Sequence, residues 1–161
     1  MIQFLKLYKR LLYKKEIFIY IMDKEALINH ALENDNNESI IQLTSQKIKT
    51  MKNDVLQQLQ LPREKLKCLH KKLKEYRYVD EIQDINYGCF LRWINLKNID
   101  NLNLTTGAYL CEIQINNSGT GMICKNIFNK HFYVCMDEIL LFQKLTDQEK
   151  ILLSVMDHLN K

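Results

Sequence analysis

All four glycines of this chain lie in its second half, at Gly88, Gly107, Gly119 and Gly121. In the glycine-free first half, apolar residues recur at steps of three and four, which is the period of an α-helix. From Asp80 onward they recur at every second residue, which is the period of a β-strand. This change of period predicts an α+β chain in which helices come first and a small sheet follows.

Charge divides in the same way along the 161 residues. Residues 1–78 hold sixteen Lys and Arg against nine Asp and Glu, a net charge of +7. Residues 79–161 hold seven against ten, a net charge of −3. A nucleic acid would therefore be attracted by the first part of the chain and not by the second.

The helical half divides into two predicted parts. Residues 1–32 form an N-terminal helical segment that is apolar on most sides. Residues 33–78 form a helical arm of two helices broken at Pro62, because proline fits the first turn of a new helix. The sequence leaves open whether these two helices form a hairpin or a kinked rod. Their apolar stripes are Ile41, Thr44, Ile48, Met51, Val55 and Leu59, and then Leu66, Leu69, Leu73 and Tyr76.

Residues 79–161 are predicted to form a small β domain that ends in a helix. Strands are expected at 90–94, 108–115, 121–125, 132–136 and 139–145, and a helix is expected after Thr146. In the second strand, Tyr109, Cys111, Ile113 and Ile115 should share one face. Five short strands with one long early loop favour an SH3-like or Sm-like antiparallel barrel, and an open antiparallel sheet is the alternative.

The sequence shows no motif of a reaction. Phosphate-binding loops, a nucleophile elbow and a paired-histidine zinc motif are all missing, so an enzyme is not expected. Cys111, Cys124, His131 and Cys135 are the candidate metal ligands, but they lack the CxxC spacing of zinc sites. Alternate strand positions of a small core also favour cysteine as a buried apolar residue. We therefore predict neither a metal nor another cofactor.

Five cysteines without a secretory signal indicate a reducing, cytoplasmic compartment. The apolar run at residues 17–22 is far shorter than the roughly 20 residues that cross a bilayer. No membrane span is expected.

Two groups of residues are candidates for binding macromolecules. Aromatic and basic residues of the β domain could line a peptide groove, with Trp93 and Tyr133 expected to be exposed; this predicted protein-binding set is Arg92, Trp93, Tyr109 and Tyr133. The helix after Pro62 carries a basic ridge that could neutralise phosphates, with Arg63, Lys67, Lys71, Lys74 and Arg77 as its predicted contacts. A solvated lysine-rich face explains the same ridge without a ligand.

Three segments of the chain resemble an uncharacterised protein family of large nucleocytoplasmic DNA viruses of the giant-virus type. They are residues 75–82 (EYRYVDEI), 87–94 (YGCFLRWI) and 142–150 (FQKLTDQEK), and the resemblance covers roughly residues 62–160. It implies a viral protein of the host cytoplasm or the virion. It implies no activity and no functional residue.

These observations together predict a non-enzymatic interaction protein. Its β-barrel would recognise another protein, and its helical arm would associate with itself, as a homodimer, or with a partner. The alternative is a nucleic-acid-binding accessory protein that uses the basic ridge.

Overall fold

The computed structural model describes residues 25–34, 37–116 and 119–159. The helix expected over residues 2–22 lies outside them. The described chain is mixed α+β and forms two compact units. Residues 43–146 make up the larger unit, and residues up to 42 combine with residues from 147 onward in the smaller one. None of the described helices is long and apolar enough to cross a membrane.

The smaller unit contains three helical segments. Residues 25–32 are helical, α2 spans Glu38–Ile41 and α5 spans Asp147–Leu159, as the C-terminal helical pattern predicted. The side-chain amide of Gln148 joins them, because its Oε1 accepts hydrogen bonds from Nδ2 of Asn34 (3.1 Å) and of Asn37 (3.3 Å). Its Nε2 lies 3.2 Å from Nδ1 of His30. The buried side chains of Ala31, Ile40, Leu152 and Leu153 form the apolar interior.

The larger unit is built on one six-stranded antiparallel sheet with the order β1-β6-β2-β3-β4-β5. Its strands are β1 Tyr76–Val79, β2 Phe90–Asn95, β3 Ala108–Asn116, β4 Gly119–Lys125, β5 His131–Cys135 and β6 Ile139–Lys144. The five predicted strands are confirmed. β1 was missed, because Tyr76 was counted into the apolar stripe of the preceding helix, whereas that helix ends at Lys72.

Strong curvature brings strands that are not neighbours close together. Trp93 on β2 and Phe132 on β5 have ring centroids only 6.0 Å apart. In a flat sheet these strands, separated by β3 and β4, would lie about 14 Å apart. One cluster on this inner face takes residues from all six strands; it includes Val79, Leu91, Trp93, Leu110, Met122, Cys124, Val134, Ile139 and Leu141.

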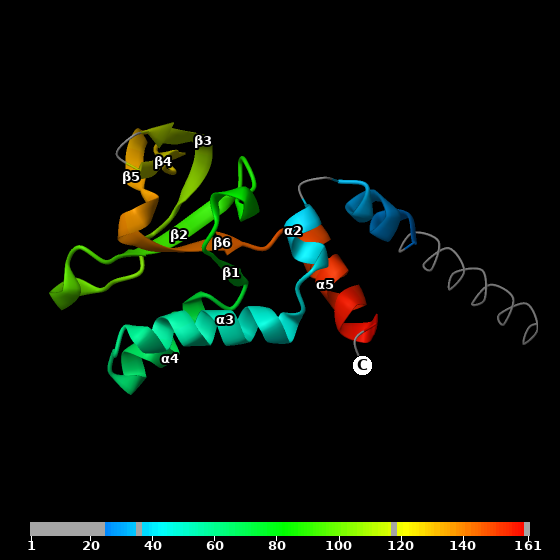
Figure 1. The fold of residues 1–161 in the computed structure, drawn as a ribbon, viewed down its shortest axis with the longest axis horizontal. Coiled ribbons are helices and arrows are strands. Elements are labelled where there is room, and N and C mark those ends of the chain that lie inside the picture. The colour runs from blue at the N-terminus through cyan, green and yellow to red at the C-terminus, as the bar shows by residue number, and fades with distance from the viewer. Residues whose placement is uncertain (1–24, 35–36, 117–118, 160–161) are drawn as a thin grey trace, which may run out of the picture. The chain divides into compact units, whose positions relative to one another are not determined.

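Helices α3 (Ser45–Gln58) and α4 (Arg63–Lys72) cover part of the opposite, outer face. They form a hairpin and not a kinked rod, because Leu56 of α3 and Leu69 of α4 meet in one cluster while Lys52 reaches back to Leu73. That cluster also holds Tyr76 of β1, Phe142 of β6 and Ile94 of β2. The helices predicted as an arm thus pack on the sheet, beside β1 and β6 and away from β5 (Figure 1).

The buried face of α3 differs from the predicted stripe. Ile48, Lys52 and Leu56 are buried at steps of four, while Met51, Val55 and Leu59 are only partly buried. A lysine in this position was not expected. Its ammonium group donates hydrogen bonds to the carbonyls of Leu73 and Tyr76, and these bonds offset part of the free-energy cost of removing the group from water.

A β-bulge changes the predicted faces of β3. The register shifts between Leu110 and Glu112, so that Leu110 and Ile113 both pack on the inner cluster although they are three residues apart. Tyr109, which simple alternation had put on the face of Ile113, lies on the outer face and is 46% exposed. Alternation on the two sides of the bulge is therefore out of phase.

Candidate functional site: the open face of the sheet

The outer face of the sheet is covered by helices on one side only. The cluster beneath α3 and α4 involves β1, β6 and β2. Farther along the sheet, Tyr109 of β3 and Tyr133 of β5 keep 46% and 52% of their surface exposed. We call the outward-facing residues of this part the open face: Phe90, which borders the cluster beneath the helices, and Arg92, Tyr109, Glu112, Ile123, Lys125, His131 and Tyr133.

Cross-strand pairing sets aromatic and basic residues in one row across the open face. Phe90 pairs with Tyr109, Tyr109 with Lys125, and Lys125 with His131, so the row crosses β2, β3, β4 and β5. The rings of Phe90 and Tyr109 meet edge to face, with centroids 5.0 Å apart and planes at 73°. This contact fixes the position of the Tyr109 ring while half of its surface stays exposed.

Tyr133 forms the second aromatic position of the open face. It pairs with Ile123, and its ring extends over the neighbouring Gly121. A Cβ atom at Gly121 would overlap the Tyr133 ring and hydroxyl. The glycine therefore leaves the space in which the ring lies across β4.

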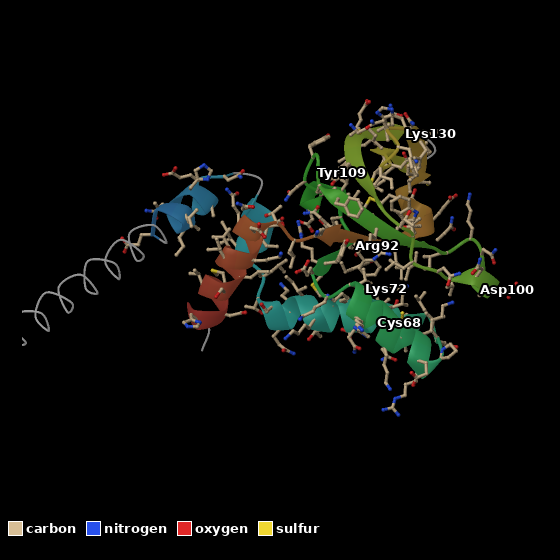
Figure 2. All side chains as sticks on the ribbon, turned by 180° about the vertical axis from the view of Figure 1, so that it is seen from behind. Cys68, Lys72, Arg92, Asp100, Tyr109 and Lys130 are labelled. Carbon is tan, nitrogen blue, oxygen red and sulfur yellow. The ribbon has the colours of Figure 1, made fainter. Side chains whose placement is uncertain are left out.

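Arg92 borders the row and is held by neighbours from two segments. Its Nε donates a hydrogen bond to the carbonyl of Thr105 at 2.8 Å, and its side chain also bonds to that of Tyr76. Burial raises the pKa of Tyr76, and the positive charge of Arg92 opposes this rise. Arg92 is half-buried, so it offers a positioned charge at the edge of the open face (Figure 2).

Trp93 does not belong to this site. Only 8% of its surface is exposed, and its ring packs in the inner cluster near Phe132. The prediction that Trp93 is exposed is therefore wrong, while the same prediction for Tyr133 is confirmed. In β2 the outward positions are Phe90, Arg92 and Ile94, so Trp93, which lies between Arg92 and Ile94, must point inward.

Positive charge predominates on and beside the open face. Arg92 and Lys125 belong to it, and the exposed Lys130 lies in the turn before β5 (Figure 2). Glu112 is its single acidic residue, and its carboxylate accepts a hydrogen bond from Gln114. No sequence signal indicated the roles of Phe90, Lys125 and His131 here, because only strand register brings them into one row with Tyr109.

The basic ridge is reduced to four residues, three on α4 and one, Lys74, just after its end. Arg63, Lys67, Lys71 and Lys74 are exposed, and Lys67 forms an ion pair with Glu64 at 3.3 Å. Arg77 is only 2% exposed and donates from Nη2 to the carbonyl of Asp84 at 2.6 Å, so it cannot contact a nucleic acid. Its position on a strand, and not on the helix, is the reason.

The candidate metal ligands are not brought together. Cys124 is buried on the inner face, where burial, and then the nearby Cys111, raises its pKa to about 11, whereas Cys111 itself is exposed. His131 and Cys135 stand at opposite ends of β5, about 13 Å apart at the rise of a strand. Among the described residues, no three His, Cys, Asp or Glu side chains could hold one ion.

Comparison with family models, with curated proteins and with solved structures found no match to this chain. The resemblance to a giant-virus family therefore stays a prediction.

Proposed function

We propose that this chain is a non-enzymatic protein-recognition module that binds its partner on the open face. The observation that carries the proposal is the pair of tyrosines, Tyr109 and Tyr133, which remain half exposed on the part of the outer sheet face that α3 and α4 leave uncovered. Exposed aromatic residues of this kind are enriched at protein interfaces. Ile127 and Phe128, both about three-quarters exposed in the turn between β4 and β5, extend the apolar surface.

The topology supports the same proposal. The order β6-β2-β3-β4-β5, with a 3-10 turn η4 (Met136–Glu138) between β5 and β6, is the strand order of SH3-like barrels. In this interpretation β1 is an addition at the edge of β6. Small barrels of this class commonly bind extended peptides on aromatic surfaces.

The charges of the open face define the chemistry of the partner. Arg92 and Lys125, with Lys130 beside them, stand against the single acid Glu112. A segment of another protein that combines acidic with apolar side chains complements this surface. The resemblance to viral proteins would place that partner in an infected cytoplasm or in a virion.

A peptide display library selected on the full chain tests this proposal. Selected peptides should be rich in acidic and apolar residues. Tyr109→Ala or Tyr133→Ala should lower the affinity for these peptides at least about tenfold, which corresponds to about 1.4 kcal/mol. Tyr87→Ala is the matched control, because Tyr87 is 67% exposed outside the open face. Peptides that bind all three variants equally would refute the open face as the site.

Nucleic-acid binding is the second candidate, and the exposed cations Arg63, Lys67 and Lys71 on α4, with Lys74 just after it, favour it. The test is binding of single-stranded and duplex oligonucleotides over a series of salt concentrations. If the ridge binds phosphates, affinity falls steeply with salt, and combining Lys67→Glu with Lys71→Glu abolishes it. Lys47→Glu combined with Lys49→Glu on the exposed side of α3 controls for net charge. Weak binding that both double variants reduce equally would exclude a specific role for α4.

Self-association stays a prediction, but the apolar stripes of α3 and α4 are no longer the surface through which we expect it. The helical arm was expected to pair with another copy through its apolar stripes. In the structure Leu69 and Leu73 of these stripes, together with Leu56, pack against the sheet of the same chain. A dimer would have to use other surfaces. Light scattering across a concentration series measures whether such a dimer forms.

A further inference from the structure

A pocket opens in the larger unit between the end of β1 and the turn η4. Its volume is about 290 Å³. Tyr78, Val79 and Asp80 form one wall together with Ile82, and Thr120, Met136 and Asp137 form the other with Ile139 and Leu141. The pocket shares no residue with the open face. Cavities for drug-sized ligands measure about 300–1,000 Å³, so this one suits a single side chain better than a cofactor.

The pocket combines an apolar floor with a polar rim. Val79, Ile139 and Leu141 are at most 9% exposed and belong to the inner cluster, with Ile82 and Met136 packed against it. The charged residues that line the pocket are Asp80 and Asp137, and both are exposed. Because the floor residues expose very little surface, most of the accessible lining is polar, and a ligand must above all present a positive or hydrogen-bond-donating group to the rim.

Both carboxylates are positioned by their neighbours. Asp80 accepts a hydrogen bond from the hydroxyl of Tyr78 at 2.8 Å. Burial, and then the bond to Asp80 and its charge, raises the pKa of Tyr78 to about 12, so Tyr78 keeps its proton at neutral pH. Asp137 lies against Gly119, whose φ of +124° suits glycine and whose missing Cβ leaves room for the carboxylate.

The positive charge that these carboxylates would attract is not supplied by the described part of the chain. The neighbouring acid Glu138 is ion-paired with Lys97 at 2.7 Å. No Lys, Arg or His among the described residues forms an ion pair with Asp80 or Asp137. The glutamate next to the pocket is thus neutralised, and the two aspartates that line it are not.

We propose that this pocket receives a lysine or arginine side chain from the surface of a partner protein. The aliphatic part of such a side chain would lie beside Ile82 and Met136, the partly exposed apolar residues of the pocket, and its charged end would reach Asp80 and Asp137. This site is separate from the open face, and its chemistry is opposite, since the open face takes acidic residues. The inference stands whether or not Tyr109 and Tyr133 bind a protein.

NMR titration of the full-length protein with blocked amino acids tests the pocket directly. The probes are the Nα-acetyl methylamides of lysine and arginine, with that of norleucine as the uncharged control for the stem. We expect the lysine and arginine probes to shift the amide signals of Thr120 and of residues 136–141. The norleucine probe should shift them much less, because it lacks the charged end.

Three variants decide whether the two aspartates carry the binding. Asp80→Asn and Asp137→Asn should each lower the affinity for the lysine and arginine probes at least about fivefold, as expected for the loss of one charge-assisted contact. Glu81→Gln is the matched control, because it removes the same charge beside Asp80 from an exposed residue that does not line the pocket. Equal weakening by all three variants, equal shifts with norleucine, or no shifts at residues 136–141 would each overturn the proposal.

Discussion

The ammonium group of Lys52 lies 2.6 Å from the carbonyl oxygen of Leu73, the residue that caps the end of α4. It donates a second hydrogen bond to the carbonyl of Tyr76, at 2.8 Å, where β1 begins. One side chain of α3 thus satisfies two carbonyls at the point where helix changes to strand. Carbonyls at a helix end need such partners when they are buried.

Lys52→Met should destabilise the larger unit. Methionine fills similar space but leaves two carbonyls without their donor, which costs about 1–3 kcal/mol of unfolding free energy. Lys49→Met on the exposed side of the same helix is the control and should change stability by less than about 0.5 kcal/mol. Urea unfolding followed by circular dichroism measures both; equal losses would show that the buried hydrogen bonds of Lys52 do not matter.

The contribution of Lys52 should also depend on pH. Burial, and then the charge of Lys49, lowers the pKa of Lys52 below its ordinary 10.5. Between these two pKa values the unfolded chain binds more protons than the folded one, so stability rises with pH. The difference in unfolding free energy between wild type and Lys52→Met should widen as pH rises toward 10.5. A constant difference over that range would contradict the lowered pKa.

Gly121→Ala should disturb the site through Tyr133. The new methyl group would overlap the tyrosine ring, so the ring must move or the strands must separate. Adding Tyr133→Ala removes the overlap, and the double variant should therefore be more stable than the sum of the two single changes predicts. Thermal unfolding of the four proteins measures this coupling. Additive changes would mean that the ring does not lie over Gly121.

Gln143→Leu should loosen the segment between β1 and β2. Gln143 is fully buried, and its Oε1 accepts a hydrogen bond from the backbone N–H of Asn86 at 3.0 Å. Loss of this acceptor should cost about 1–3 kcal/mol. Lys144→Leu, at the next and exposed position of β6, is the control. Limited proteolysis should cut residues 80–89 faster in Gln143→Leu than in wild type or Lys144→Leu. Equal cleavage rates in all three proteins would show that the Gln143 hydrogen bond does not hold this segment.

Periodicity succeeded where a single face of an element is buried. Five strands and the helices α3, α4 and α5 follow from their apolar spacing. It failed at β1, where Tyr76–Val79 continues the helical spacing by chance and four residues are too few to show alternation. It failed again at Leu110, because a bulge inserts one residue and no local signal in this segment marks it.

Placement of charge was harder to predict than placement of apolar residues. Lys52 and Arg77 are both buried, although lysine and arginine are usually exposed. Each is held by backbone carbonyls outside its own element: Lys52 donates to Leu73, and Arg77 donates to Asp84. A charge split between two halves of the chain therefore did not indicate which cations are free to bind a ligand.

The class of the fold follows from the amino-acid sequence, because the period of apolar residues reflects which side of a helix or strand faces the core. Which residues meet at a surface depends on the three-dimensional packing. Cross-strand register put Lys125 and His131 beside Tyr109, the curl of the sheet buried Trp93, and packing of α3 and α4 covered one half of a face and left the other open. These pairings depend on contacts between residues far apart in the chain, and a single sequence carries no local record of them.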